Sequence, residues 1–309
     1  MSPSKTKLVS DILQAFDDLN GGVHRGYRPA HAKGLLLSGA FTPSPGGRSL
    51  TRAPHLHREQ TPVTVRLSDF AGVPAIHDND PNAGPRGIAI RFHLAEHTHT
   101  DIIAHSTDGF PTRTAEEFVE FLYAAYASGP DTPHPSPIEA FLGTHPAALR
   151  FVQTPKPFPA SFARESFFGV NAYLFTNHEG AAAYGRYRIR PDGDGEYLEP
   201  SAAAAKTPNY LFDELRERVA KGAVTFRILV QLSAKGDIVD DATVQWPEDR
   251  AQIEFGKIEL TALAPDNDAE QRHIIFDPIP RVDGIAASAD PLLEPRADVY
   301  LASGRRRRS

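Results

Sequence analysis

TPVTVRLS at residues 61–68 and GIAIRFHL at residues 87–94 are the stretches that decide the fold class. In the first, apolar side chains stand at every second position, at Val63, Val65 and Leu67. Because successive side chains of a strand point to opposite faces, this period of two predicts strands with one buried face. Similar β-rich runs follow at residues 168–175, 183–189, 223–233 and 252–263. Many strands without regularly alternating helices favour an antiparallel sheet, which can close into a barrel.

Helical patterns flank and interrupt these strands. Apolar residues such as Val9 and Ile12 follow helical spacing near the start of the chain. Thr114, followed three residues later by Glu117, is a capping box that predicts the start of a further helix. A last helix is predicted to begin near Asp290. We therefore predict an α+β fold, in which helices surround an antiparallel β-barrel.

Length and composition are those of an ordinary globular protein. The 309 residues are 40% hydrophobic and 23% charged, and no Gly/Ser-rich linker divides them. We therefore predict one domain over residues 1–309, with an N-terminal helix at 1–22 and a C-terminal helix at 290–309. The chain has no cysteine, which removes disulfides, thiolate catalysis and cysteine-bound zinc.

Charge and hydropathy argue against nucleic acid as a partner and against a membrane-spanning segment. A net charge of −6 leaves no basic footprint for nucleic acid, although residues 305–308 are four arginines. No run of apolar residues is long enough to span a membrane, so we expect no membrane span. Residues 1–19 lack the apolar core and cleavage pattern of a signal peptide. We expect a small-molecule partner and a cytoplasmic location.

Two short stretches carry candidates for chemistry. In RPAHAKG, at residues 28–34, His31 follows Arg28 and precedes small residues, but a lone histidine in a loop is more often structural. Arg66 and Ser68 share the face of the predicted strand that lies opposite its apolar face. On the inward face of a barrel this pair would need an acid or a histidine as partner. On an exposed edge, both side chains would simply be solvated.

Five segments, taken in order, resemble the signatures of catalases. They are HAKG at 31–34, TPVTVRLSDFAG at 61–72, GPRGIAIRF at 84–92, TDIIAHS at 100–106 and RADVY at 296–300. The resemblance covers residues 24–307 and implies a β-barrel of the catalase type. Ordinary catalases continue beyond the last motif into a helical domain, whereas this sequence stops at Ser309. We therefore expect that extra C-terminal domain to be absent, as in the small catalase-related peroxidases.

The resemblance implies a haem b cofactor whose iron is bound by Tyr300 as a phenolate. A free phenol titrates near pH 10, so the anion needs stabilisation. Arg296, four residues earlier, shares a helical face with Tyr300 and can supply a positive charge. The resemblance also implies that Arg28, Arg66 and Arg307 pair with the haem propionates, because buried carboxylates need cationic partners.

On the distal side of the haem, the resemblance implies that His31 is the acid and base for peroxide, with Ser68 hydrogen-bonded to its second ring nitrogen. Phe118 is expected to stack near the haem, with simple core packing as the alternative. Typical catalases carry an asparagine where this sequence has His105. His105 can donate a hydrogen bond to peroxide, but it is bulkier and can titrate. We therefore expect weak or no catalase activity.

The predicted function is a haem peroxidase that reduces hydrogen peroxide or organic hydroperoxides with a small organic electron donor, as in an oxidative stress response. Two alternatives stay open: a haem enzyme that rearranges fatty-acid hydroperoxides, and a non-catalytic haem-binding barrel. The lack of cysteine and the single methionine suit exposure to peroxide, although compositional drift explains them equally well. The sequence fixes neither the donor nor whether the chain forms a homo-oligomer.

A non-haem metal site is not expected. Histidines are frequent between the third and fourth catalase-like segments, at His93, His97, His99 and His105. Their spacing matches neither an HExxH motif nor a facial triad of two histidines and a carboxylate.

Overall fold

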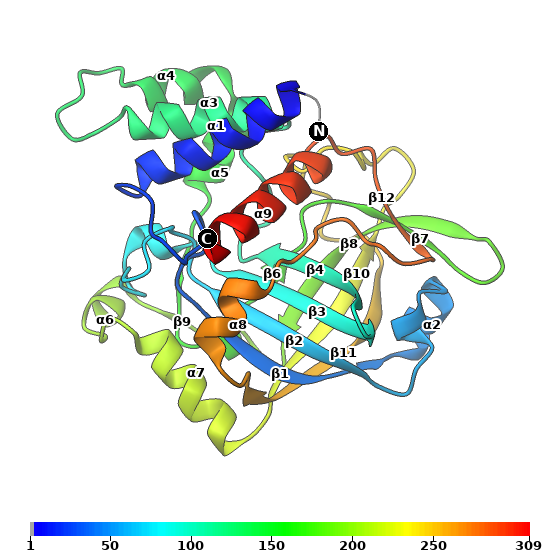
Figure 1. Cartoon of the computed structure of the whole chain (residues 1–309). Coiled ribbons are helices and arrows are strands. Elements are labelled where there is room, and N and C mark those ends of the chain that lie inside the picture. Colours follow the sequence, from blue (N-terminus) through cyan, green and yellow to red (C-terminus); the bar gives the residue numbers. More distant parts are fainter. Residues whose placement is uncertain (1–2) are drawn as a thin grey trace.

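A closed antiparallel barrel is the centre of the fold in a computed structural model that describes residues 3–309 (Figure 1). The ring closes because β10 pairs both with β11 and with β8. Its eight strands, in order around the ring, are β10 (Val224–Leu232), β11 (Gln252–Leu263), β1 (Gly34–Pro43), β2 (Thr61–Ser68), β3 (Gly87–Ala95), β4 (Thr98–His105), β6 (Phe167–Phe168) and β8 (Ala182–Pro191). The predicted antiparallel barrel with surrounding helices is confirmed.

Short strands extend the sheet beyond the ring. β7 (Tyr173–Thr176) pairs with β8, and β12 (Ile285–Ala287) pairs with β7. A separate pair is formed by β5 (Phe158–Pro159) and β9 (Tyr197–Leu198). The two strands predicted from alternation are β2 and β3, which pair with each other.

The barrel interior is the main hydrophobic core. Val63, Val65 and Leu67 of β2 are buried there, and each fully buried side chain of this size contributes about 1.5–3 kcal/mol. The opposite face of β2 therefore points out of the barrel. Arg66 and Ser68 lie on that outer face, so neither of the two positions considered from the sequence, the inward face of a barrel and an exposed edge, describes them. Both are nevertheless buried, because other elements cover this part of the wall.

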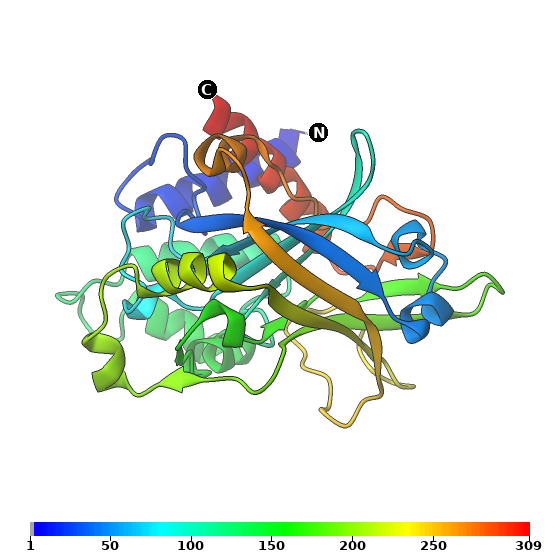
Figure 2. The same ribbon diagram turned by 90° about the horizontal axis from the view of Figure 1, so that it is seen from below.

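Helices supply that cover. α1 (Pro3–Leu19), α3 (Ala115–Tyr126) and α9 (Leu293–Arg308) lie together on one side of the barrel (Figures 1 and 2). The other helices are α2 (Pro45–Leu50), α4 (Pro137–Thr144), α5 (Pro146–Gln153), α6 (Pro200–Ala204), α7 (Tyr210–Lys221) and α8 (Asn267–His273). Three short 3-10 turns are η1 (Pro54–Leu56), η2 (Pro81–Ala83) and η3 (Phe162–Arg164). None of the helices in the described part of the chain has the length and apolar character that a membrane crossing needs.

The ends of these helices follow from local chemistry. α3 begins with the predicted capping box, in which Thr114 and Glu117 each bond the other's backbone N–H. α1 ends at Leu19, before the predicted residue 22, because Gly21 and Gly22 take positive φ values of 74° and 123°. α9 begins at Leu293, three residues later than the predicted start at residue 290. The carboxylate of Asp290 accepts a hydrogen bond from the N–H of Leu292, so Asp290 lies before the first turn of the helix and not inside it. Residues 1–2 of the predicted N-terminal helix lie outside the described residues.

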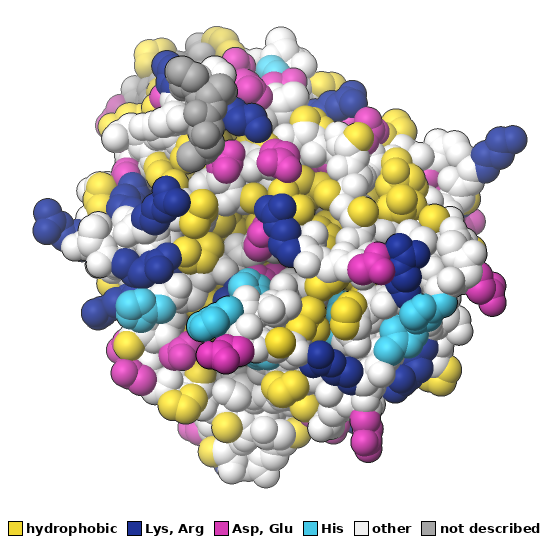
Figure 3. Space-filling view, turned by 45° about the vertical axis from the view of Figure 1, so that its right-hand side comes forward, with side chains coloured by type: hydrophobic (Ala, Val, Ile, Leu, Met, Phe, Trp, Pro, Cys, Tyr) yellow, Lys and Arg dark blue, Asp and Glu magenta, His cyan; other side chains and the backbone are white. Residues whose placement is uncertain are grey.

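Charged side chains of both signs lie on one face of the molecule. On the face drawn in Figure 3, several Lys and Arg side chains lie together at the left edge, Asp and Glu side chains are scattered over the rest of the face, and apolar side chains gather near its centre.

Candidate active site

A cavity of about 1170 Å³ lies between the outer wall of the barrel and the helices. Its walls come from β2, β3 and β4 on the barrel side and from α1, α3 and α9 on the helical side. Ligand pockets commonly measure about 300–1,000 Å³, so this cavity has room for a large cofactor. All nine residues singled out in the sequence line it: Arg28, His31, Arg66, Ser68, His105, Phe118, Arg296, Tyr300 and Arg307.

His31 is held in a strained backbone conformation. Its φ of 57° lies in the left-handed region, which costs a non-glycine residue about 1–3 kcal/mol. The surrounding chain enforces this conformation, because the His31 N–H donates to the Phe70 carbonyl (2.6 Å) and the Ala32 N–H to the Ala71 carbonyl (3.0 Å). The His31 carbonyl in turn accepts from Arg66 Nη2 at 2.8 Å. These contacts fix the direction of the His31 side chain.

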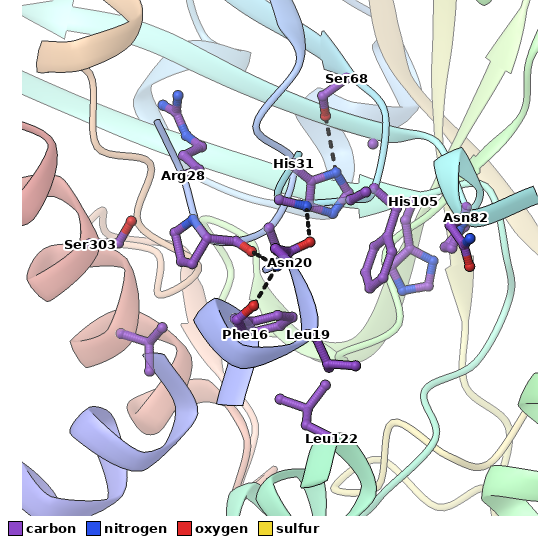
Figure 4. A pocket seen from close by; sticks show the side chains of 18 of the residues that line it. Phe16, Leu19, Asn20, Arg28, His31, Ser68, Asn82, His105, Leu122 and Ser303 are labelled. Atoms are coloured by element: carbon purple, nitrogen blue, oxygen red, sulfur yellow. Dashed lines mark hydrogen bonds between the residues drawn. The ribbon is translucent and has the colours of Figure 1, made fainter. Parts of the chain in front are cut away.

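The ring of His31 is positioned by Ser68, with 3.1 Å between Nδ1 and Oγ (Figure 4). The second ring nitrogen, Nε2, forms no hydrogen bond with a side chain of residues 3–309. Gly87 allows this pairing, because a Cβ there would come within 2.7 Å of both Nδ1 and Oγ. Burial and the nearby Arg66 lower the pKa of His31 to about 3. The ring is therefore neutral at neutral pH and can accept a proton.

His105 ends β4 and lies on the same side of the cavity as His31 (Figure 4). The backbone N–H of Thr107 donates to its Nδ1 over 3.4 Å. This contact favours the tautomer that carries its proton on Nε2. Burial and the charge of Arg296 lower the pKa of His105 to about 3, so this ring is also neutral. His105 is therefore suited to donate a hydrogen bond where His31 accepts one.

α9 supplies the tyrosine of the site. Arg296 Nη2 donates to the Tyr300 oxygen at 3.2 Å, one helical turn along the same face. Burial lowers the pKa of Arg296, but Tyr300 and Tyr173 beside it raise that pKa overall. A charged guanidinium therefore stays next to the phenol oxygen.

Asn171 and Asp290 complete this arrangement, although the sequence did not point to either as a residue of the site. Arg296 also donates to the Asn171 side-chain oxygen, and the Asn171 amide donates to Asp290 at 2.8 Å. Both residues are buried. The signal in the sequence was a polar residue, Asn171, inside the β-rich run 168–175. Asp290 was noticed only as the place where the last helix was predicted to begin, not as a residue of the site.

Three arginines gather around the link between α8 and α9. Arg28 and Arg307 both donate to the carbonyl of Ile274, at 3.0 and 2.9 Å, and Arg66 Nε donates to the side chain of Gln271 at 3.0 Å. None of the three forms an ion pair with a carboxylate of residues 3–309, and Arg307 Nε has no partner. Burial and Arg307 lower the pKa of Arg66 to about 9. This cluster lacks an anion and suits a ligand with carboxylates.

Phe118 belongs to the apolar wall of the cavity. It packs against Phe16 of α1, with ring centroids 5.9 Å apart, and against Phe110 at 5.1 Å. Phe118 therefore holds the helical layer together and also lines the cavity. Its stacking on a cofactor stays a prediction.

The other histidines of the predicted third and fourth segments do not join the site. His93 pairs with His99 across β3 and β4, and the side chain of His97 is 92% exposed in the turn between them. Only His105 of this group reaches the cavity. Among the residues that the structure describes, no group of three or more His, Asp or Glu side chains is placed to hold a metal ion.

Fold and cavity together define a class of protein, a closed antiparallel barrel with a cofactor-sized cavity on its outer wall. A tyrosine–arginine pair and two neutral histidines face that cavity. The chain belongs to the catalase family, whose model, described as catalase, matches residues 26–309.

Relatives of known name agree with this assignment. A catalase-related peroxidase of Mycolicibacterium paratuberculosis is 34% identical, over 94% of this chain and 92% of its own length. A catalase-related peroxidase of Synechococcus elongatus is 31% identical, over 91% of this chain and 84% of its own length. The predicted likeness to small catalase-related peroxidases and the oxidoreductase class are confirmed.

Solved structures support the fold. A fungal catalase aligns with a TM-score of 0.78 and 24% identity, over 91% of this chain and 59% of its own. Catalase A of Saccharomyces cerevisiae aligns with a TM-score of 0.79 and 23% identity, over 91% of this chain and 61% of its own. The chain thus spans about three fifths of these catalases, with which it shares the barrel.

The family implies a haem cofactor, and the residues of the cavity fit one. The cavity is large and mostly apolar, its buried arginine cluster has no anionic partner, and a phenol oxygen lies beside a fixed positive charge. These are the features that a flat, apolar dicarboxylate with a bound iron requires.

The arginine cluster gives a first prediction. We expect Arg307→Gln to shorten the lifetime of bound haem about tenfold, because a charge-assisted hydrogen bond contributes about 1.5–3 kcal/mol. The measurement is the rate of haem transfer to excess apomyoglobin. Arg305→Gln is the matched control, since Arg305 lies exposed in the same helix. Equal rates for the two variants would show that Arg307 does not hold the cofactor.

Proposed function

We propose that this protein is a haem b peroxidase, which reduces hydrogen peroxide or organic hydroperoxides with a small organic electron donor and has weak or no catalase activity. The observation that carries the proposal is the meeting of neutral His31 and the Tyr300–Arg296 pair at one cofactor-sized cavity. The relatives named catalase-related peroxidase support it. We also propose that residues 1–309 form one domain and act in the cytoplasm, with the oligomeric state left open.

The cofactor would be held by residues of two kinds. Tyr300 would bind the iron through its phenol oxygen, while Arg296 keeps a positive charge 3.2 Å from that oxygen. Arg28, Arg66 and Arg307 would pair with the two propionates. When bound, haem supplies an iron centre that takes oxidising equivalents from peroxide and passes them to the donor.

His31 would move the proton. Heterolysis of a peroxide needs a proton shifted from one oxygen to the other, so that the second oxygen leaves as water or an alcohol. Neutral His31 can take that proton on Nε2 and return it, since Ser68 occupies Nδ1. His105 would hold the peroxide by a hydrogen bond from its own Nε2–H. The two histidines thus play opposite roles, as acceptor and donor.

His105 would also limit catalase activity, because its ring takes up more of the cavity than an asparagine would. We expect His105→Asn to raise the rate of oxygen release from hydrogen peroxide about tenfold relative to the rate of donor oxidation. Oxygen release and donor oxidation, measured on the same preparation, test this. His105→Phe is the control, because it keeps a large ring but removes the N–H that donates a hydrogen bond. It should raise neither the rate of oxygen release nor the rate of electron-donor oxidation. An unchanged ratio in His105→Asn would remove His105 from the explanation.

The proposed function is tested with purified holoprotein, hydrogen peroxide and a phenolic donor. The expected result is a ferric tyrosinate-type spectrum that peroxide changes and the donor restores. Rapid oxygen release without donor would instead indicate a catalase. Loss of a fatty-acid hydroperoxide without donor, giving an epoxide or ketone, would indicate a rearranging enzyme. A spectrum that peroxide leaves unchanged would indicate a haem-binding barrel without turnover.

A further inference from the structure

One cation of the cavity has no role in the proposed function. Among the Lys, Arg, Asp and Glu side chains of residues 3–309 that line the cavity, Asp80 is the single carboxylate. Four of the cations are the arginines already assigned to Tyr300 and to the propionates. The fifth is Lys156, which follows the end of α5.

The ammonium group of Lys156 is only partly satisfied. It donates to the carbonyls of Phe151 (2.8 Å) and Thr154 (3.0 Å), which uses two of its three N–H groups. It forms no ion pair with a carboxylate among residues 3–309. Burial lowers the pKa of Lys156, as it does for a charge that has lost water without gaining a counter-ion. One N–H and the positive charge are therefore available to an anion.

The surroundings of Lys156 are apolar. Its ammonium lies 4.9 Å from the ring centre of Phe151, and Val152 of the same helix also lines the cavity. Val152 is 46% exposed, and Leu19 on the end of α1 is 37% exposed. Exposed apolar side chains around a cavity are typical of a site that takes an apolar ligand. Hydrogen peroxide, which is small and polar, gains nothing from such walls.

Lys156 lines the same cavity as His105, and its charge adds to the effect of burial and Arg296 that lowers the pKa of His105. Asp80 is the carboxylate of the cavity wall that could repel a bound anion. Its carboxylate already accepts the N–H of Asn82 at 2.7 Å, and five cations line the same cavity. The balance of charge therefore favours a ligand with one negative group.

We propose that Lys156 and the apolar walls of α3 and α5 bind an apolar monocarboxylic acid, with the carboxylate on the Lys156 ammonium and the hydrocarbon body against Phe118, Phe121 and Phe151. This inference rests on the proposed function and deepens it, because it names the class of the organic co-substrate. That co-substrate is either the electron donor or an organic hydroperoxide, and both would present the same carboxylate.

Binding without turnover is the first test. Holoprotein is titrated with decanoate and with decanol in a calorimeter. Lys156→Gln keeps N–H donors for the two carbonyls but removes the charge, so decanoate should bind about tenfold more weakly, which corresponds to about 1.4 kcal/mol, while decanol is unaffected. Lys156→Arg should restore binding of decanoate. The matched control is Lys235→Gln, since Lys235 is exposed and does not line the cavity.

Kinetics then separate the two sources of the carboxylate. In Lys156→Gln, a raised KM for a fatty-acid hydroperoxide but not for cumene hydroperoxide would identify the hydroperoxide. A raised KM for a phenolic carboxylic acid but not for a neutral phenol would identify the donor. Equal affinity of wild type and Lys156→Gln for decanoate would overturn the inference, and so would a KM that moves for neither pair. If peroxidase activity were absent altogether, the decanoate titration would still report on the site by itself.

Discussion

Tyr300→Phe is expected to yield protein that retains at least tenfold less haem and lacks the tyrosinate-type ferric spectrum. The substitution removes the phenol oxygen and leaves the charge of Arg296 facing the cavity without its partner at 3.2 Å. Even outer partners of a metal ligand change metal affinity by about 10–100-fold, so loss of the ligand itself should cost at least that much. The measurement is haem content per chain, together with the absorption spectrum.

Tyr173→Phe is the matched control for this variant. Tyr173 is also buried beside Arg296, but its hydroxyl donates to the Pro278 carbonyl at 2.9 Å and it does not line the cavity. We expect it to keep the wild-type spectrum. Thermal unfolding of both variants without haem shows whether the barrel is intact. A Tyr300→Phe protein with full haem and an unchanged spectrum would exclude Tyr300 as the iron ligand.

Sequence alone could predict the strands that carry apolar side chains on one face and polar side chains on the other. β2 alternates because its apolar side chains fill the barrel while Arg66 and Ser68 face the cavity. β1 was missed because Leu35, Leu36 and Leu37 are all buried, the first and third inside the barrel and the second in a separate cluster outside it. A strand covered on both faces shows no period of two, and its signal is lost.

Some residues of the site could also be predicted from the sequence, and others could not. The motifs that resemble catalases led to nine residues that share one cavity. Alternation alone set Arg66 and Ser68 opposite the apolar face of β2, but it did not reveal that this face lies outside the barrel. Asn171 and Asp290 were missed because their hydrogen bond joins segments 119 residues apart. A contact of that kind depends on how the chain folds back, which no local pattern records.

His31→Ala is expected to lower the rate of reaction with hydrogen peroxide about 10²–10⁴-fold while haem content stays unchanged. The reason is that His31 is the neutral base whose Nε2 has no side-chain partner among residues 3–309, whereas the cofactor would be held by other residues. Stopped-flow absorbance at the haem band measures this rate. Ser68→Ala, which releases Nδ1 but leaves the base, should cost less, about tenfold.

The pH dependence of the rate of reaction with hydrogen peroxide shows whether His31 acts as a base or only occupies space in the cavity. The pKa of His31 is lowered to about 3 in the folded protein, below its ordinary value of about 6.5, so the ring is already deprotonated above about pH 5. The wild-type rate should therefore be constant between about pH 5 and 8, and it should fall only as the pH approaches the lowered pKa. A fall near pH 6.5 would mean that the ring is charged when peroxide arrives. If His31→Ala kept the wild-type rate at full haem content, proton transfer would have to be assigned to His105, whose pKa is lowered in the same way.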